Sequence, residues 1–215
     1  TVDWFTDAAH WSGSDGIPAR FGEHLGYSAL ALGIAAVIAI PIGLWIGHTG
    51  RLRGVAVVLS GAVRALPTLG LLTGLVLLAG IGLGAPIASL VVLSIPPLLA
   101  GAYAGVESVD ADTVAAAKAI GFTGTQVLTR VEIPLALPVI LGGVRSAALQ
   151  VIATATITAY VGLGGLGRYI FDGQAVRDYP RMVAGSVLVI VLALVVDAAI
   201  LAAQRFFTTS HRRTR

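Results

Sequence analysis

Three glycines in one short segment form the chain's most suggestive chemical pattern. Gly162, Gly164 and Gly167 are spaced as in G-x-G-x-x-G, which binds a dinucleotide pyrophosphate where a strand turns into a helix. Here the pattern follows a long apolar run, and no strand–helix–strand unit surrounds it. We therefore expect a flexible bend at this segment, and no nucleotide site.

Residues arranged for hydrolysis, metal binding or ATP binding are missing from the sequence. No G-x-x-x-x-G-K-[ST] motif occurs, so ATP cannot be held in a P-loop. The sequence has no cysteine and no H-E-x-x-H motif, and its four histidines are far apart. We expect no catalytic residue, metal or cofactor in this chain, so energy must come from a partner protein or an ion gradient.

Three charged residues stand inside long apolar runs. Placing such a charge in the middle of a membrane costs at least about 2.5 kcal/mol of free energy unless the charge is paired or hydrated. Arg145 and Asp197 are predicted at similar depths in two different runs, and we expect a structural ion pair between them. Arg64 lies near the middle of a third run, close to Pro67. Arg64 and Pro67 are candidates for lining a solute pathway, with helix packing as the alternative for Arg64.

The runs that carry these residues are long enough to cross a membrane. Hydrophobic residues make up 56% of the 215 residues and charged residues only 12%, whereas soluble domains have about 25% charged residues. From Ala65 to Val106 no charged residue occurs over 42 positions, while one spanning helix needs about 20. The chain is therefore predicted to be an all-α integral membrane protein with about five transmembrane helices, expected at 25–47, 54–79, 87–106, 135–161 and 182–204.

The remaining segments complete the predicted organisation. Residues 1–24 are expected to lie outside the membrane or on its surface, where aromatic residues such as Trp4 and Trp11 could share one face of a short helix. Residues 25–206 form the transmembrane domain, and residues 207–215 form a basic tail.

Lysine and arginine residues are distributed unequally between the two predicted faces. One face carries eight, namely Arg51, Arg53, Lys118, Arg130, Arg205, Arg212, Arg213 and Arg215, and the other carries four, namely Arg20, Arg168, Arg177 and Arg181. The face with eight is predicted to be cytoplasmic, with the N-terminus outside and the C-terminus inside. Because these residues flank apolar runs and form no continuous patch, no nucleic-acid partner is expected despite the net charge of +3.

Small residues and prolines inside the predicted spans favour a packed bundle with a solute pathway. Glycines at four-residue spacing let helices approach closely, and the pairs are Gly43/Gly47, Gly70/Gly74 and Gly101/Gly105. Proline is tolerated where neighbouring helices or a water-filled cavity satisfy the freed carbonyls, and the prolines concerned are Pro41, Pro67, Pro96 and Pro97.

A polar loop at about 107–132, between the third and fourth spans, contains a predicted short helix. Asp112 can cap its N-terminus, and the residues 113–120 are rich in alanine. Lys118 lies in the last turn, where a cation opposes the helix dipole, and Gly121 suits the left-handed position that ends a helix. Such a helix is either a plain connector or a segment that binds in the groove of another protein.

The same loop resembles the cytoplasmic EAA loop of binding-protein-dependent ABC importer permeases, with the type I fold of that class. The family pattern is E-A-A, three residues, Gly, nine residues and I-x-L-P. Ala116, Ala117, Gly121 and Pro134 match it, whereas Ala115 stands where the family has glutamate. The resemblance implies that an ATPase contacts this loop, whose candidate coupling residues are Asp112, Ala115, Ala116, Ala117, Lys118, Gly121 and Pro134.

Further stretches are similar to permeases for glycine betaine, choline and carnitine. Residues 64–72 resemble Q-T-I-P-S-L-A-L-L, and residues 143–147, 153–157 and 162–167 resemble G-I-R-T-A, T-A-T-I and G-A-G-G-L-G. The likeness covers about 23–205 and implies an importer of small osmoprotectant solutes. Methionine and phosphonate permeases share the glycine-rich segment, so an ABC permease for such a solute, or for an amino acid, is the alternative within the class.

The resemblance also implies a bacterial cytoplasmic membrane location and a set of partners. A separate extracytoplasmic binding protein would deliver the solute, and two permease subunits, identical or paralogous, would form the path. Two ATP-binding cassette subunits would hold ATP and Mg, contact the loops and drive the switch between inward- and outward-facing states.

Two functions from other classes fit the residues less well. An ATP-independent secondary transporter usually shows internal repeats and charged coupling sites at the midplane of the membrane, and the sequence contains no repeat. A membrane enzyme would need a cluster of reactive side chains, which the sequence lacks.

Overall fold

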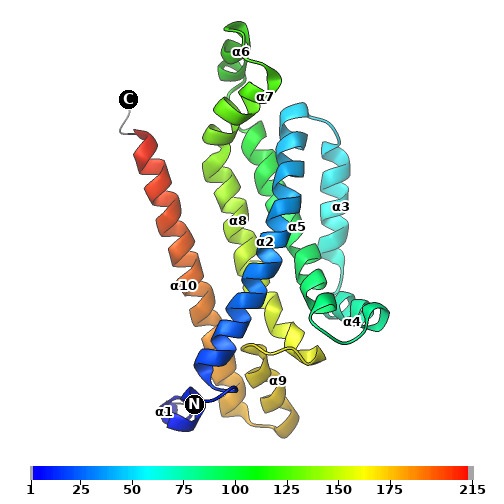
Figure 1. Ribbon diagram of the computed structural model, residues 1–215, viewed down its shortest axis with the longest axis vertical. Helices are drawn as coiled ribbons and strands as arrows, with labels where there is room; N and C mark the ends of the chain where they lie inside the picture. The colour runs from blue at the N-terminus through cyan, green and yellow to red at the C-terminus, as the bar shows by residue number, and fades with distance from the viewer. Residues whose placement is uncertain (1, 213–215) are drawn as a thin grey trace. The chain divides into compact units, whose positions relative to one another are not determined.

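The structure is a computed structural model that describes the backbone of residues 2–212 and the side chains of residues 3–205 (Figure 1). Within that range the regular elements are helices, with a five-residue π-helical turn at η2. They are α1 Val2–Thr6, η1 Ala8–Trp11, α2 Ile17–Thr49, α3 Arg53–Ala65, α4 Thr68–Ala79, α5 Gly84–Glu107, α6 Ala111–Ala119, α7 Gly124–Val127, η2 Leu128–Glu132, α8 Ile133–Ala155, η3 Thr156–Val161, α9 Gly167–Val176 and α10 Tyr179–Arg212.

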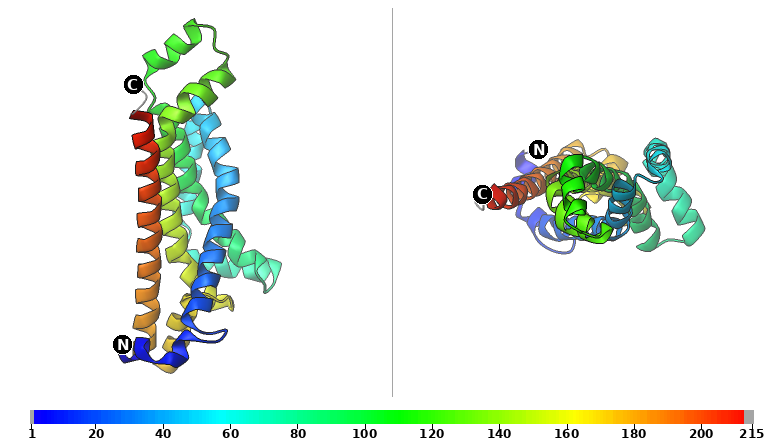
Figure 2. Two further views of the ribbon diagram at one scale, coloured as in Figure 1. Left: turned by 60° about the vertical axis from the view of Figure 1, so that its left-hand side comes forward. Right: turned by 90° about the horizontal axis from the view of Figure 1, so that it is seen from above.

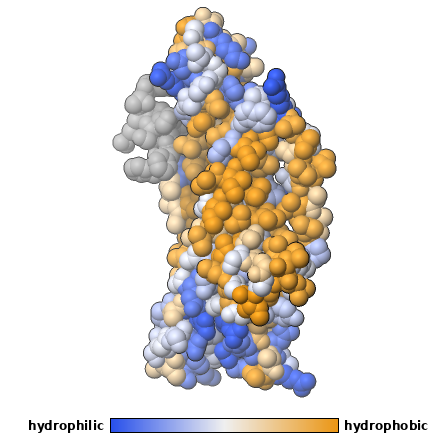
Figure 3. Space-filling model, turned by 45° about the vertical axis from the view of Figure 1, so that its right-hand side comes forward, coloured by the Kyte–Doolittle hydropathy of each residue, from blue (hydrophilic) through white to orange (hydrophobic). Residues whose placement is uncertain are grey.

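Four helical segments in the described range are long and apolar enough to cross a membrane. They are α2, α5, the run from α7 through η3, and α10, and the broken pair of α3 and α4 qualifies as a fifth. Hydrophobic side chains cover much of the face that carries α3 (Figure 3). The predicted all-α membrane fold with about five spans is confirmed, although α2 starts at Ile17, earlier than the expected residue 25.

The predicted continuous second span is wrong, because it breaks at Leu66 and Pro67. Helix α3 ends at Ala65, α4 begins at Thr68, and the chain bends by 88° at the break. Pro67 has no N–H to donate, and its ring restricts the residue before it to extended backbone. The chain therefore leaves the helix here and starts a new one.

By internal packing the chain divides into two compact units, and each is described by itself. The first unit contains Thr1–Gly33, Leu66–Ser94 and Ala148–Ala199. The second contains Ile34–Ala65, Ile95–Ala147 and Ile200–Arg215. The long helices α2, α5, α8 and α10 contribute residues to both units, and the basic tail from Arg213 onward lies outside the described residues.

The first unit has an aromatic core that includes the N-terminal segment. Trp4 is buried, stacks on His10 with 4.1 Å between ring centroids, and meets the Tyr169 ring edge-on at 5.2 Å. Tyr169 donates its hydroxyl to the carbonyl of Asp15 at 2.6 Å, and burial raises the pKa of this hydroxyl, which keeps it protonated. The expectation that Trp4 and Trp11 share one helix face is wrong, because Asp7 ends the first helix and caps η1, which leaves Trp11 52% exposed.

The glycine-rich segment forms a bend, as the sequence predicts, and this bend contacts the first turns of α2. Gly165 donates its N–H to Oε2 of Glu23 at 2.8 Å and has a φ of +89°. A Cβ on Gly167 would lie 2.1 Å from the carbonyl oxygen of Thr156. Glycine is needed here for backbone conformation and close packing, which explains the dinucleotide-like spacing without a nucleotide.

The second unit is packed through small residues on three helices. A Cβ on Gly43 of α2 would lie 2.6 Å from the Cβ of Ala102 on α5, and a Cβ on Gly101 would lie 2.6 Å from the Cα of Gly143 on α8. Such distances allow no side chain, so α2, α5 and α8 approach one another at backbone distance in this unit. Of the three predicted glycine pairs, Gly43/Gly47 and Gly101/Gly105 pack against other helices, whereas Gly70/Gly74 do not.

Candidate functional site

Helix α6 is the short alanine-rich helix that the sequence predicts in the polar loop. Asp110 caps it, accepting a hydrogen bond from the Thr113 N–H at 2.9 Å through Oδ1. The prediction that Asp112 is the cap is therefore wrong by two residues. Asp112 lies in the first turn instead, where its negative charge favours the positive end of the helix dipole.

The end of α6 follows the prediction closely. Gly121 has a φ of +93°, a left-handed conformation that glycine adopts without strain. Phe122 donates its N–H to the carbonyl of Ala117 at 3.1 Å, and Gly121 donates to that of Lys118 at 3.0 Å. This pair of bonds is a Schellman motif, which satisfies the last carbonyls of the helix and turns the chain away.

The surface of α6 consists mainly of small, exposed side chains. Ala117 is buried, whereas Ala115, Ala116 and Lys118 are exposed, and Ile120 at the end is 76% exposed. In the second unit, α6 and α7 project beyond the ends of α2 and α5 (Figures 1 and 2). A projecting helix with small side chains and one exposed isoleucine suits insertion into a groove of another protein.

The return from α6 to the bundle runs through α7 and the π-helical turn η2. Thr123 accepts from the N–H of Gln126, while the side chain of Gln126 accepts from the N–H of Thr123, which forms a capping box at the start of α7. In η2, Ile133 donates its N–H to the carbonyl of Leu128, five residues back. Pro134 follows directly, and its ring cannot approach the carbonyl four residues earlier, so a wider turn fits this entry into α8.

Glu132, in the π-helical turn, has a buried carboxylate that binds a histidine from the end of α2. Its side chain is 7% exposed, and Oε2 lies 2.5 Å from Nδ1 of His48. A Cβ on Gly124, the first residue of α7, would lie 3.5 Å from Nε2 of His48. The imidazole of His48 therefore sits between α7 and the entry into α8, and it connects the last turn of α2 to the polar loop.

An ion pair holds the other end of the loop. Glu107 is the last residue of α5, and its Oε1 lies 3.4 Å from Nε of Arg53 at the start of α3. Arg53 is 62% exposed at its side chain, so solvent weakens this pair. Both ends of the segment that carries α6 are nevertheless joined to other helices of the second unit.

Sequence analysis missed His48, Glu107 and Glu132 as contributors to the site. His48 and Glu132 are 84 residues apart in the chain, so no local spacing connects them. A usable signal was the position of each residue at the edge of an apolar run, where an acid and a base on the same side of the membrane can pair.

The other predicted site residues lie elsewhere. Arg64 is in the last turn of α3 and Pro67 immediately precedes α4, and both are exposed. Arg145 lies in α8 and Asp197 in α10, and both are half-buried. The pathway role and the predicted ion pair stay predictions.

The described part of the chain combines membrane-length helices with a short projecting helix, which defines a multi-pass membrane protein, and comparison with known proteins gives its family. The family described as "Binding-protein-dependent transport system inner membrane component" matches residues 39–208. The chain belongs to this family of ABC importer permeases, in which the ATPase is a separate subunit. It is accordingly a multi-pass inner membrane protein with ATPase and binding-protein partners.

Transport permeases of several bacteria are similar to the chain in sequence. The chain is 33% identical to the glycine betaine/carnitine/choline transport system permease protein OpuCB of Bacillus subtilis, over 88% of this chain and 87% of that protein. It is 36% identical to the carnitine transport permease protein OpuCD of Listeria monocytogenes, over 83% and 80%. It is 34% identical to the osmoprotectant import permease protein OsmW of Salmonella typhimurium, over 81% and 84%.

Solved structures share the fold. A chain of the MetNI methionine ABC transporter in an inward-facing conformation superimposes with a TM-score of 0.77 at 21% identity, over 86% of this chain and 93% of that chain. A chain of an amino acid ABC transporter gives a TM-score of 0.69 at 20% identity, over 87% and 92%. At these identities the likeness describes the fold alone.

The left-handed end of α6 generates a prediction about Gly121. A β-branched residue in this conformation is strained by about 1–3 kcal/mol, so Gly121→Val should redirect the chain that leaves α6. We expect normal membrane insertion but weaker co-purification with the ATPase subunit. Gly124→Ala is the matched control, because a Cβ there meets its nearest neighbour at an ordinary 3.5 Å. Equal ATPase association of both variants and the unmodified protein would contradict the role given to this helix end.

Proposed function

We propose that this chain is the permease of an importer for small osmoprotectant solutes such as glycine betaine, choline or carnitine. One observation carries the proposal. Relatives named as permeases for these solutes, among them OpuCB and OpuCD, are 33% and 36% identical to the chain over more than four fifths of its length. Methionine transport has weaker support, because the methionine transporter is similar at only 21% identity.

The proposed complex contains two permease subunits, two ATP-binding cassette subunits and one extracytoplasmic binding protein. ATP and Mg would be bound by the cassette subunits. Helix α6 would insert into a groove of a cassette subunit with Ala115, Ala116 and Lys118 at the contact. Support comes from the exposure of these three side chains and from the two contacts, His48 with Glu132 and Arg53 with Glu107, that hold the loop to α2 and α3.

The proposed orientation places α6 in the cytoplasm and the N-terminal segment outside. Support comes from the excess of arginine and lysine on the α6 side of the predicted topology. A cysteine at the exposed Ser14 should react with membrane-impermeant thiol reagents in intact cells, and a cysteine at the exposed Thr125 in α7 should not. The opposite labelling would reverse the orientation and remove the argument for an ATPase contact.

Uptake by the reconstituted complex tests the substrate class. Proteoliposomes with the chain, its ATPase and its binding protein should accumulate labelled glycine betaine, choline or carnitine on addition of ATP, and should not accumulate methionine. Methionine uptake in place of the three osmoprotectants would overturn the proposed substrate class.

Arg64→Gln is expected to lower this uptake several-fold without changing solute affinity for the binding protein, if Arg64 and Pro67 line the pathway.

We also propose that Arg145 and Asp197 form a structural ion pair, as their predicted depths suggest. Removing one partner of a buried pair typically costs about 3–5 kcal/mol. Arg145→Ala or Asp197→Ala should therefore lower the melting temperature in detergent, and the double variant should lose less than the sum. Additive losses would argue against the pair.

A further inference from the structure

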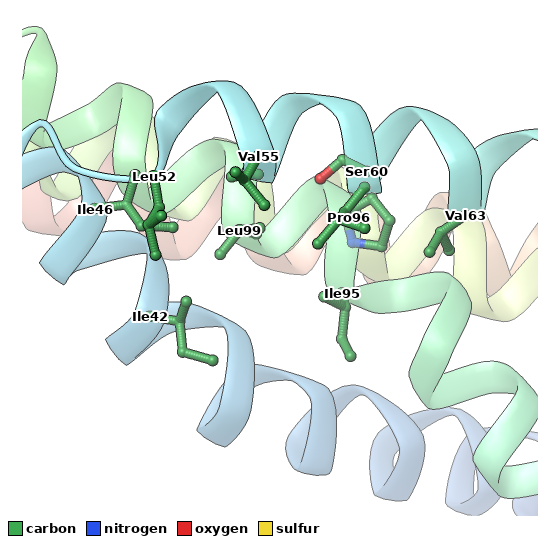
Figure 4. Close-up of a pocket in the computed structure, with 11 residues that line it drawn as sticks. Ile42, Ile46, Leu52, Val55, Ser60, Val63, Ile95, Pro96 and Leu99 are labelled. Carbon is green, nitrogen blue, oxygen red and sulfur yellow. The ribbon is translucent and has the colours of Figure 1, made fainter.

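An apolar groove of about 380 Å³ lies in the second unit between α2, α3 and α5. Its walls include Ile42 and Ile46 of α2, Val55 and Leu59 of α3, and Leu99 of α5. Figure 4 shows labelled side chains from these helices around the space between α2 and α3. The only polar side chain in the lining is that of Ser60. The volume falls within the range of about 300–1,000 Å³ that small-molecule sites have.

The mouth of this groove is formed by the short turn between α2 and α3. Leu52 lines the groove, is 58% exposed and has a φ of +59°. A bulky residue is rarely held in this left-handed conformation, and such strain is found at ligand clamps. The backbone conformation of Leu52 thus keeps an apolar side chain at the mouth between two arginines, Arg51 and Arg53.

The two arginines differ in their surroundings. Arg53 pairs with Glu107 at 3.4 Å, whereas the exposed Arg51 has no acidic partner among the side chains that the structure describes. Arg51 also lies in the turn between two apolar helices, and basic residues at the ends of apolar helices are expected near the lipid phosphates of a membrane. A free guanidinium at this depth beside an apolar groove is complementary to an amphiphilic anion.

We propose that the groove is a binding site for an anionic phospholipid of the surrounding membrane. One acyl chain lies between α2 and α3, and the lipid phosphate binds the guanidinium of Arg51. The transported solute does not suit this space, because the quaternary ammonium group of the proposed solutes needs polar or aromatic partners and the lining offers only Ser60. A second copy of this chain is disfavoured at this groove, because Arg51 and Arg53 make its mouth basic.

Native mass spectrometry of the complete purified transporter tests the proposal with phosphatidylglycerol and phosphatidylcholine as ligands. The unmodified protein should retain phosphatidylglycerol in preference to phosphatidylcholine. Arg51→Gln should weaken phosphatidylglycerol binding by about fivefold and abolish the preference. Leu59→Trp should fill the groove and reduce the binding of both lipids.

Two variants serve as matched controls. Val58→Trp places the same side chain on an adjacent residue of α3 that is 71% exposed and does not line the groove. Arg177→Gln removes an exposed arginine of the first unit. Both should bind the two lipids as the unmodified protein does.

Three results would overturn the proposal. The first is unchanged lipid preference in Arg51→Gln, which removes the charge proposed to bind the lipid phosphate. The second is displacement of bound lipid by any detergent without preference for the anionic lipid. The third is a Leu59→Trp protein that keeps both lipids but loses its permease partner, which would assign the groove to a second copy.

Discussion

The contact between His48 and Glu132 is the interaction on which the functional arrangement depends. A carboxylate with a side chain only 7% exposed is unfavourable without a partner, and the imidazole of His48 supplies one at 2.5 Å. Because Glu132 lies in the π-helical turn, this bond joins the end of α2 to the place where the polar loop enters α8. The pair of Arg53 and Glu107 joins the loop's other end to α3.

The packing of the second unit allows a displacement of this loop to be passed on. Gly43 and Gly101 bring α2, α5 and α8 to backbone distance, and no side chain separates Gly101 from Gly143. Helices packed in this way have few alternative positions, because sliding would force side chains into the backbone of the neighbour. We infer that a push on α6 moves these helix ends together, which is what coupling between an ATPase and a membrane bundle requires.

The sequence was enough to predict the parts of the site that depend only on neighbouring residues in the chain. The alanine-rich helix, Lys118 in its last turn and the left-handed Gly121 each follow from backbone preferences, and the EAA pattern added the family. The cap was misassigned because Asp110 and Asp112 are chemically equivalent, and only the position of the first turn distinguishes them.

Contacts between distant segments could not be predicted. Glu23 and Gly165 are 142 residues apart, so the spacing of the glycines alone suggested a flexible bend. The break at Pro67 was missed because proline also occurs inside unbroken helices of this chain, such as Pro41 in α2 and Pro96 in α5. Whether a proline breaks a helix depends on which neighbours satisfy the freed carbonyls, and a single sequence does not contain that information.

The central claim is that α6 transmits force because its loop is held to the bundle, and ATP hydrolysis by the reconstituted complex tests it most directly. The measurement compares stimulation by the loaded binding protein in His48→Gln, Glu132→Gln and the double variant, with membrane insertion and ATPase association checked in each. Each single variant should retain basal hydrolysis, lose most of the stimulation and move less solute per ATP, and the double variant should be no worse than either. Full stimulation and an unchanged ratio of solute to ATP in the single variants would contradict the account.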